Sequence, residues 1–371
     1  MDLKRGLKEQ IADDLKEKMV ILAGPRQAGK TTLAKSIRRG DHMYLNYDVT
    51  QDRRKILNEE FTESTLWVFD EIHKFRKWKN FLKGIYDSQK GQHEILVTGS
   101  ARLDLARKAG DSLQGRYHLL RMHPLTFKEL GILRQSTLNE LFQLGGFPEP
   151  FFSSSRKKAN RWSNEYQSRV IEEEISKQER INDLSAFELL SMRLPECVGS
   201  PLSINALSED LQYNFATVRR WLLLLEKFYS LFFVAPFGSS NVKAVKKERK
   251  HYHFDWNCLE SPGARFECMI AVHLLKYVQF YEDTEGRKLQ LRFFRDIEGR
   301  EVDFVVTERD RAIMAIECKY SDDEISKPLK FFKGKFPTVA CWQLSLDGKK
   351  NYVSKDGIRV APAIELLKDL A

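Results

Sequence analysis

The sequence lacks any run of apolar residues long enough to span a membrane. No stretch approaches the ~18 consecutive apolar residues of a transmembrane helix, so we expect no membrane association. The first residues, Met1–Arg5, are not followed by an apolar segment, and so we expect no secretory signal. Internal repeats and low-complexity tracts are also missing. The 371 residues are enough for two or three compact domains.

Cysteine is scarce and scattered along the chain. The five cysteines form neither a Cys-x-x-Cys pair nor a Cys/His comb. This spacing argues against a structural zinc site and is typical of reduced thiols, so we expect a cytoplasmic protein. The cysteines are Cys197, Cys258, Cys268, Cys318 and Cys341.

Acidic residues are outnumbered by basic ones, which gives a formal net charge of +9. A basic balance favours an acidic partner such as DNA or another nucleic acid. A solvated, lysine-rich surface that touches no nucleic acid explains the same excess equally well.

The N-terminal third alternates short apolar runs with helical stretches, which predicts a parallel α/β sheet covered on both faces. The runs are Met19–Ala23, Leu66–Phe69 and Ile95–Thr98. A mainly helical region follows, and the last third returns to strands in which apolar and polar residues alternate. The expected domains are residues 1–135, 136–240 and 241–371, with the basic segment Asn241–Lys250 as a linker.

Residues 24–31 read Gly-Pro-Arg-Gln-Ala-Gly-Lys-Thr and satisfy the phosphate-loop pattern G-x-x-x-x-G-K-[ST]. An apolar run precedes the loop and a helical pattern follows it, which is the context that the motif needs. Backbone N–H groups of such a loop converge on phosphate oxygens. We expect Lys30 to reach the β- and γ-phosphates of ATP and Thr31 to offer its hydroxyl to Mg²⁺. The expected nucleotide contacts are Gly24, Pro25, Arg26, Gln27, Ala28, Gly29, Lys30, Thr31 and Thr32.

The apolar run Leu66–Phe69 ends in the two carboxylates Asp70 and Glu71. Ligands of open α/β sheets bind at the carboxyl ends of the strands. We therefore expect Asp70 to hold Mg²⁺ and Glu71 to polarise the attacking water. A strand that ends in two solvated acids is the alternative.

Three further polar residues are candidates for catalysis. Thr98 and Ser100 follow the third apolar run and are placed to hydrogen-bond the γ-phosphate or the water, unless they only form a turn. Arg116 is a candidate arginine finger, acting in trans if the protein assembles into a ring or dimer. An ordinary surface arginine is the alternative for this residue.

The middle region contains two short helices around a tight turn, followed by the strand-like run Ser230–Pro236. This order is typical of a helix-turn-helix with a wing. On the second helix an apolar face leaves Thr217, Arg219 and Arg220 facing outward, as on a recognition helix that contacts DNA. A packing or dimerisation module is the alternative.

In the last third, the strands Glu301–Val306 and Ala312–Lys319 are joined by a charged turn. Glu317 and Lys319 share a face because strand side chains alternate, and a hairpin brings Asp303 beside them. With Glu267 from a helix, the set resembles a nuclease core in which carboxylates hold Mg²⁺. The solvated face of an amphipathic sheet is the alternative.

Taken together, these motifs resemble the prokaryotic AAA-type ATPases that carry a C-terminal domain of unknown function. The resemblance implies an α/β fold class with an AAA+ type P-loop NTPase domain, a helical and winged-helix middle region, and a C-terminal restriction-endonuclease-like α/β domain of the PD-(D/E)xK type. Relatives tend to have aspartate where this chain has Glu173-Glu174. The residues that carry the resemblance, besides the phosphate loop, are Asp70–Lys74 with Trp78, Thr98–Ser100, Ser112–Arg116, Pro124–Glu129, Gly145–Pro148, Trp162, Tyr166 and Ile171.

The expected function is Mg²⁺-dependent ATP binding and hydrolysis coupled to nucleic-acid binding or processing. We expect a homo-oligomer or a protein partner. The alternative is a nucleotide-switched protein-interaction module whose nuclease-like domain is inactive.

Overall fold

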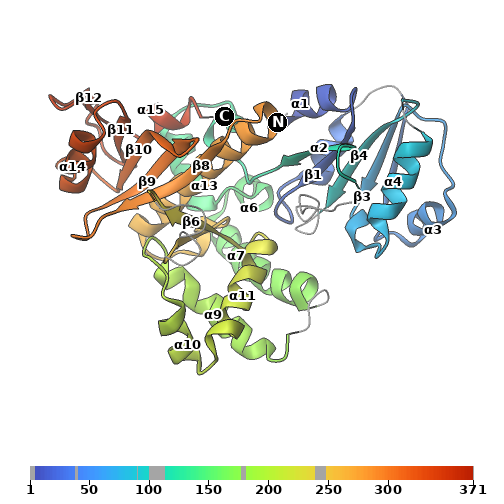
Figure 1. Ribbon diagram of the computed structural model, residues 1–371, viewed down its shortest axis with the longest axis horizontal. Helices are drawn as coiled ribbons and strands as arrows, with labels where there is room; N and C mark the ends of the chain where they lie inside the picture. Colours follow the sequence, from blue (N-terminus) through green and yellow to red (C-terminus); the bar gives the residue numbers. More distant parts are fainter. Residues whose placement is uncertain are drawn as a thin grey trace. The chain divides into compact units, whose positions relative to one another are not determined.

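The computed structural model describes residues 5–37, 41–89, 91–99, 113–176, 181–238 and 248–370 (Figure 1). The chain forms two compact units, Met1–Pro124 and Leu125–Ala371. Among the helices of these described segments, none has both the length and the apolar character that crossing a bilayer demands.

The N-terminal unit is built on a five-stranded parallel sheet with the order β2-β3-β4-β1-β5. Every residue of β1 and β3 is buried, which is the pattern of strands covered on both faces. β4 lies between β1 and β3, so the end of β4 is flanked by the two strands expected to carry the site. The strands are β1 (Met19–Ala23), β2 (His42–Asn46), β3 (Leu66–Asp70), β4 (Glu94–Gly99) and β5 (Tyr117–Arg121).

Helices lie on both faces of this sheet (Figure 1). Met19, Ile21 and Ala23 of β1 pack with residues of α3 and α4, while the alternate residues Val20 and Leu22 are buried on the other side. This double burial explains why the strand reads as a continuous apolar run. The helices are α1 (Leu7–Asp14), α2 (Lys30–Ser36), α3 (Thr50–Asn58), η1 (Ile72–Lys74) and α4 (Trp78–Ser88).

The second unit begins with a helical region. Ser203 and Asn214 cap α10 and α11 by accepting hydrogen bonds from backbone N–H groups, which explains where these two helices start. The elements are η3 (Phe127–Leu130), α5 (Gln135–Leu144), α6 (Pro148–Phe152), α7 (Arg156–Arg169), the π-helical η4 (Val170–Ile175), α9 (Leu184–Arg193), η5 (Leu194–Cys197), α10 (Ile204–Leu211) and α11 (Phe215–Lys227).

The rest of the second unit is a mixed eight-stranded sheet with the order β12-β13-β11-β10-β9-β8-β6-β7 and the long helix α13 packed against it. Phe332 of α14 and Phe294 of β8 belong to a second core on this sheet. The elements are β6 (Leu231–Pro236), β7 (Lys250–His253), η6 (Trp256–Cys258), α13 (Pro262–Glu285), β8 (Leu289–Arg295), β9 (Glu301–Glu308), β10 (Arg311–Lys319), α14 (Lys327–Lys335), β11 (Ala340–Ser345), β12 (Tyr352–Val353), β13 (Ile358–Pro362) and α15 (Ile364–Leu367).

The strand β6 joins the helical region to the C-terminal sheet. Residues Leu231–Val234 pair antiparallel with β7. The last two residues, Ala235 and Pro236, pair in parallel with β8 of the large sheet. The sheet therefore runs across residue 240, where the sequence suggests a domain boundary, because one strand serves both pairings. Most of the predicted linker lies outside the described residues.

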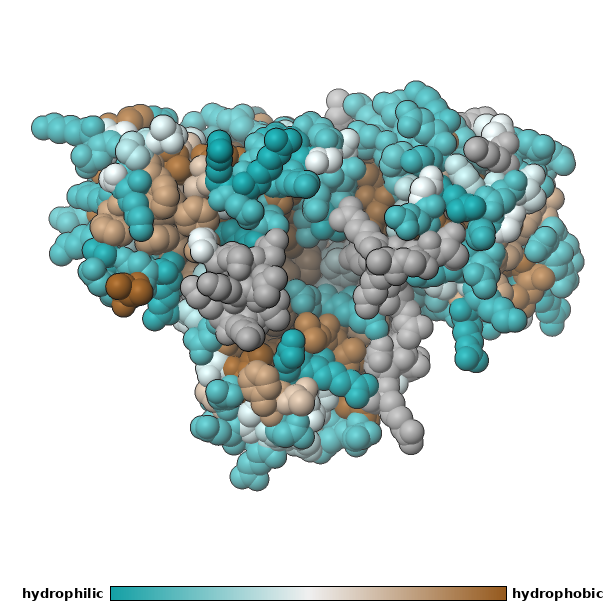
Figure 2. Space-filling model, viewed as in Figure 1, coloured by the Kyte–Doolittle hydropathy of each residue, from teal (hydrophilic) through white to brown (hydrophobic). Residues whose placement is uncertain are grey.

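The visible surface is mainly hydrophilic, with smaller hydrophobic areas between the hydrophilic ones (Figure 2). Several large apolar side chains are nevertheless exposed on the helical region, among them Leu189 and Met192 of α9 and Phe215 of α11. Scattered apolar residues of this kind are normal on a protein surface.

Candidate nucleotide site and carboxylate cluster

The phosphate loop connects β1 to α2 and carries three residues with positive φ. These are Gly24, Gln27 and Gly29, with φ of +153°, +60° and +97°. Left-handed residues in a short loop turn successive N–H groups toward a common point, which makes a concave site for an anion. Gly29 also caps the first turn of α2, so the positive end of the helix faces the same region.

Gly24 is required by a close backbone contact. A Cβ at this position would lie 2.2 Å from the carbonyl oxygen of Met122, which follows β5. The two segments are also tied by a hydrogen bond of 2.8 Å from Met122 N to Ala23 O. A side chain at residue 24 therefore cannot be accommodated unless the backbone moves.

The buried Lys30 side chain folds back over the loop. Its ammonium donates hydrogen bonds of 2.9 Å to Gly24 O and 2.7 Å to Pro25 O. Both acceptors are neutral carbonyls, whereas phosphate oxygens are charged and form stronger hydrogen bonds with an ammonium. The loop and Lys30 therefore fit a phosphate ligand.

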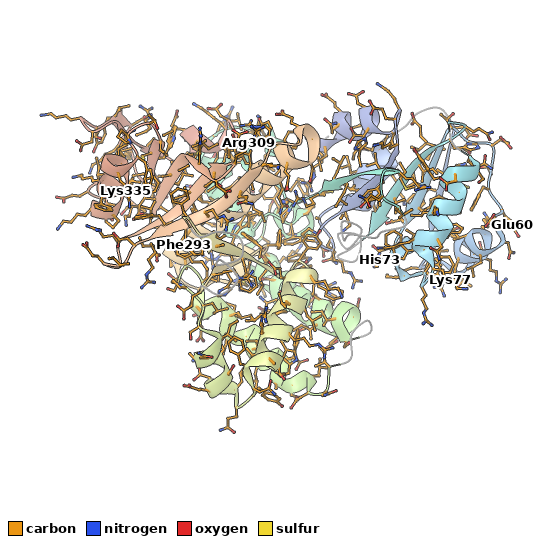
Figure 3. The ribbon with its side chains drawn as sticks, viewed as in Figure 1. Glu60, His73, Lys77, Phe293, Arg309 and Lys335 are labelled. Carbon is orange, nitrogen blue, oxygen red and sulfur yellow. The ribbon has the colours of Figure 1, made fainter. Side chains whose placement is uncertain are left out.

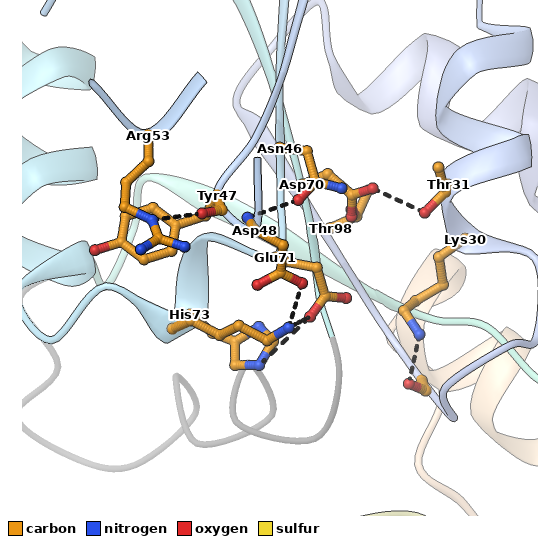
Figure 4. Close-up of polar contacts among 12 residues, drawn as sticks. Lys30, Thr31, Asn46, Tyr47, Asp48, Arg53, Asp70, Glu71, His73 and Thr98 are labelled. Atoms are coloured by element: carbon orange, nitrogen blue, oxygen red, sulfur yellow. Dashed lines mark hydrogen bonds and ion pairs between the residues drawn. The ribbon is translucent and has the colours of Figure 1, made fainter. Parts of the chain in front are cut away.

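Asp70, at the end of β3, is the centre of a buried hydrogen-bond network (Figure 4). Thr31 Oγ1 donates to Asp70 Oδ2 at 2.8 Å, and Thr98 Oγ1 donates to Oδ1. Thr98 lies there because it pairs with Asp70 in the sheet register. The hydroxyl of Tyr44 also donates to Asp70 Oδ2, at 2.6 Å. Carboxylate and hydroxyl oxygens beside a phosphate loop are a donor set that suits Mg²⁺.

Glu71 follows Asp70 in a left-handed conformation with φ of +55°. Its backbone N–H donates to Thr98 O at 3.0 Å. Its Oε2 lies 3.1 Å from Lys74 Nζ and 3.9 Å from His73 Nε2 (Figure 4). Burial lowers the pKa of Lys74, but Glu71 and Asp48 outweigh it, so the net pKa of Lys74 is raised. A charged lysine thus holds the Glu71 carboxylate in place.

Arg116 lies at the amino-terminal ends of the strands, whereas the phosphate loop, Asp70 and Glu71 lie at their carboxyl-terminal ends. Its carbonyl accepts a hydrogen bond from Met19 N, at the start of β1, whereas the phosphate loop follows the end of β1. Its guanidinium forms a two-pronged ion pair with Asp87, with distances of 2.7 and 3.0 Å. Arg116 therefore does not join the nucleotide site of its own chain. Ser100 lies outside the described residues.

Sequence reasoning missed two residues at this site, Tyr44 and Arg5. Tyr44 reaches Asp70 from the neighbouring strand β2, and burial and Asp70 raise its pKa, so it stays a neutral donor. The buried Arg5 guanidinium donates to His123 O at 3.1 Å and to Ala28 O of the loop. No local motif marks either residue, because each contact depends on the tertiary fold.

The predicted acids of the last third come together in the C-terminal unit. Glu267 projects from α13, Asp303 from β9, and Glu317 and Lys319 from β10, where Lys319 Nζ lies 3.1 Å from Glu317 Oε1. Antiparallel pairing of β9 and β10 explains their proximity, and Asp303 Oδ2 accepts a hydrogen bond of 2.8 Å from Cys318 N.

Lys250 of β7 enters the middle of these acids, which the sequence analysis did not predict. Its fully buried ammonium lies 2.6 Å from Glu301 Oε1, 3.5 Å from Glu267 Oε1 and 3.9 Å from Asp303 Oδ1. Across the described residues, no group of three or more His, Cys, Asp or Glu side chains is arranged to hold a metal ion. Lys250 thus places a positive charge where the sequence predicts a Mg²⁺ site of Glu267, Asp303 and Glu317.

The predicted recognition helix is α11. Val218 and Trp221 are buried, whereas Arg219 and Arg220 are exposed and Thr217 is half-buried. The apolar face thus packs inward and the two arginines reach solvent.

Three families of domains match consecutive parts of the chain. Residues 16–131 match the family described as AAA domain. Residues 135–258 and 262–366 match two families described as domains of unknown function, DUF8612 and DUF4143.

Similar curated proteins are uncharacterized. One from Mycobacterium tuberculosis is 24% identical over 245 residues, which cover 65% of this chain and 55% of the relative. The match thus spans about half the length of that mycobacterial protein. One from Haemophilus influenzae is 22% identical over 335 residues, covering 79% of this chain and 80% of the relative.

Solved structures are only distantly similar. The Aeropyrum pernix Orc1 protein in complex with DNA has a TM-score of 0.36 and 12% identity, covering 73% of this chain and 93% of that one. Thermotoga maritima RuvB has a TM-score of 0.31 and 17% identity, with 62% and 89% covered. The N-terminal unit has the fold of an AAA-type P-loop ATPase. This follows from the matched family of domains, the parallel sheet and the phosphate loop.

Proposed function

We propose that this chain binds ATP with Mg²⁺ at residues 24–32 and hydrolyses it, and that hydrolysis is coupled to nucleic-acid binding. The observation that carries the proposal is the meeting of Thr31, Asp70 and Thr98 beside the phosphate loop. Three different elements supply these residues, so their convergence is a property of the fold and not of one motif.

The residues of the loop divide the work of holding a triphosphate. Backbone N–H groups of the loop and the ammonium of Lys30 bind the phosphates. Thr31 and Asp70 would hold Mg²⁺, which neutralises charge on the phosphate oxygens. For this, the Thr31 hydroxyl must turn away from Asp70, to which it now donates.

Glu71 is the group that we assign to the attacking water. Its carboxylate lies one residue beyond Asp70 and is held by Lys74 on one side. An ionised carboxylate accepts a hydrogen bond from water and so orients the lone pair of the water oxygen toward phosphorus. Thr98 keeps Asp70 in place and is the polar group of β4 at this edge.

We assign Arg116 to the nucleotide site of a neighbouring copy of the chain. Arg116 lies at the amino-terminal ends of the strands, away from the phosphate loop of its own chain, so only assembly brings it to a γ-phosphate. The Asp87 ion pair would hold it until a partner arrives. A homo-oligomer is therefore part of this proposal.

The test of the ATPase is steady-state ATP turnover. We expect Lys30→Ala to abolish ATP binding, and Glu71→Gln to keep binding while lowering kcat by roughly 10²–10⁴-fold. Lys83→Ala and Glu60→Gln change exposed residues of the same unit and should leave turnover unchanged. Unaltered turnover in Glu71→Gln would remove Glu71 from the mechanism, and a wild-type protein that binds no nucleotide would end the proposal.

Nucleic-acid binding is assigned to the exposed face of α11. Arg219 and Arg220 are exposed there, and the whole chain carries a net charge of +9. Replacing both arginines with alanine should weaken binding and reduce the slope of log K against log salt by about 2. The control pair Lys157→Ala/Lys158→Ala, exposed on α7, should not change the slope.

A second function is favoured by Lys250. A lysine amid the acids suits a nuclease-like domain that does not cleave, and hence a nucleotide-switched interaction module. This protein would show ATP-dependent contacts with a protein partner and no salt-sensitive retention of nucleic acid on a filter.

A further inference from the structure

We propose that the ammonium of Lys250 is the resident cation of the C-terminal carboxylate cluster, and that this cluster binds no divalent metal. The cluster is defined as Lys250, Glu267, Glu301, Asp303, Glu317 and Lys319. The inference concerns a site separate from the ATP site and is independent of ATP hydrolysis.

The position of Lys250 is the first argument. Its ammonium lies within 4 Å of carboxylates from two elements, Glu267 of α13 and Glu301 and Asp303 of β9. The side chain is 0% exposed, whereas those of Glu267 and Asp303 keep 17% each. Burial lowers the pKa of Lys250, but the three acids outweigh it and raise the net pKa, so the ammonium stays charged.

The occupied oxygens are the second argument. Tyr252 donates to Glu267 Oε1 at 2.6 Å, and Cys318 N donates to Asp303 Oδ2 at 2.8 Å. Lys319 lies 3.1 Å from Glu317 Oε1. A divalent ion needs several free oxygens at about 2.0–2.6 Å, and here it would also meet a buried positive charge. These donors occupy one oxygen of each carboxylate, so the buried charge of Lys250 is the main obstacle to a metal ion.

The surroundings keep Lys250 in place. Its backbone forms a β-bridge with Pro201, and the neighbouring Arg249 O accepts a hydrogen bond of 2.9 Å from Leu202 N. Gly199 of the same segment packs on the Glu267 carboxylate, since a Cβ there would lie 2.9 Å from Oε2. The ammonium also lies 5.4 Å from the ring centroid of Phe293, labelled in Figure 3. Pairing on both sides thus fixes the backbone that carries the lysine.

The experiment is a Mn²⁺ titration of the full chain without nucleotide, followed by the electron paramagnetic resonance signal of free Mn²⁺. We expect wild-type protein and Asp303→Asn to give the same curve. Lys250→Met removes the charge but keeps an unbranched chain, and it should gain one Mn²⁺ per chain that Asp303→Asn removes again. Lys319→Met, the matched change at a lysine that is 31% exposed, should gain none.

Two results would overturn the inference. One is Mn²⁺ binding by the wild type that Asp303→Asn abolishes, and this comparison stands even if Lys250→Met fails to fold. The other is a folded Lys250→Met that gains no ion. Thermal unfolding gives a second readout, because bound Mn²⁺ should raise the unfolding midpoint of Lys250→Met by an amount that Asp303→Asn removes. ATP turnover enters none of these measurements, so a failure here is distinct from a failure of the proposed ATPase.

Discussion

Replacing Gly24 with alanine tests whether the phosphate loop depends on its contact with the chain after β5. The new Cβ would lie 2.2 Å from Met122 O and 3.1 Å from Met122 C, and Cβ contacts under 3.0 Å are essentially never seen. The backbone must therefore shift by roughly 1 Å, because interiors are too closely packed to absorb the overlap. The hydrogen bond between Met122 N and Ala23 O opposes that shift.

The expected magnitude follows from the overlap. Overpacking of this kind costs about 1–3 kcal/mol of the free energy of unfolding. A displacement of about 1 Å at the loop is also enough to reduce catalysis by roughly 10²-fold. Gly84 is the matched control, because it lies inside α4 and a Cβ there meets nothing within 4 Å. Gly84→Ala should stabilise the protein by about 0.5–1 kcal/mol, so the same chemical change has opposite signs at the two positions.

The measurement is urea unfolding followed by tryptophan fluorescence, since Trp67 and Trp78 are buried in the N-terminal unit. Binding of a fluorescent ATP analogue and ATP turnover are measured on the same variants. The reasoning is refuted if Gly24→Ala unfolds at the wild-type urea concentration and turns over ATP at the wild-type rate. A loss of stability in Gly84→Ala would contradict the open space around this position.

Three further changes test buried polar contacts by urea unfolding. Lys276→Met should cost about 3–5 kcal/mol because it removes the buried cation that lies 3.1 Å from the buried Glu129 carboxylate, and the double change with Glu129→Met should restore part of the loss, since Glu129 also accepts a hydrogen bond from Thr126 N. Burial lowers the pKa of His273 from 6.5 to about 4. The stability of the wild type relative to His273→Gln should therefore be greatest above pH 6.5 and fall by up to about 1.4 kcal/mol per pH unit toward pH 4. A pH-independent difference between the two proteins would contradict this. Tyr44→Phe removes a donor to Asp70 and should cost about 1.5–3 kcal/mol, and an unchanged unfolding midpoint would argue against this contact.

Apolar patterning was enough to predict most of the sheet in the N-terminal unit. The runs expected at Met19–Ala23, Leu66–Phe69 and Ile95–Thr98 coincide with β1, β3 and β4 to within a residue, because strands buried on both faces are apolar throughout. The strand His42–Asn46 was missed, since its buried positions alternate with exposed and half-buried ones. The order of the strands could not be predicted, because it depends on how the helices cross the sheet.

The phosphate loop could be predicted because all its residues are contiguous. The pairing of Asp70 with Thr98 could also be expected, since both lie at the carboxyl ends of apolar strands. Arg5 and Tyr44 could not, because each reaches the site from an element that carries no motif. For Arg116 a local pattern suggested a role, and the position of β5 shows that the residue lies at the amino-terminal ends of the strands, away from the phosphate loop of its own chain.

Lys250 shows most clearly why a local pattern can mislead. It ends a stretch rich in Lys and Arg, and such stretches are usually solvated, so composition predicts a linker there. A lysine is buried only when acids surround it, and these acids come from two other elements, α13 and β9. The same acids, considered without Lys250, favour a metal site. Their chemistry therefore depends on a cation that only the pairing of β7 with β6 brings into the cluster.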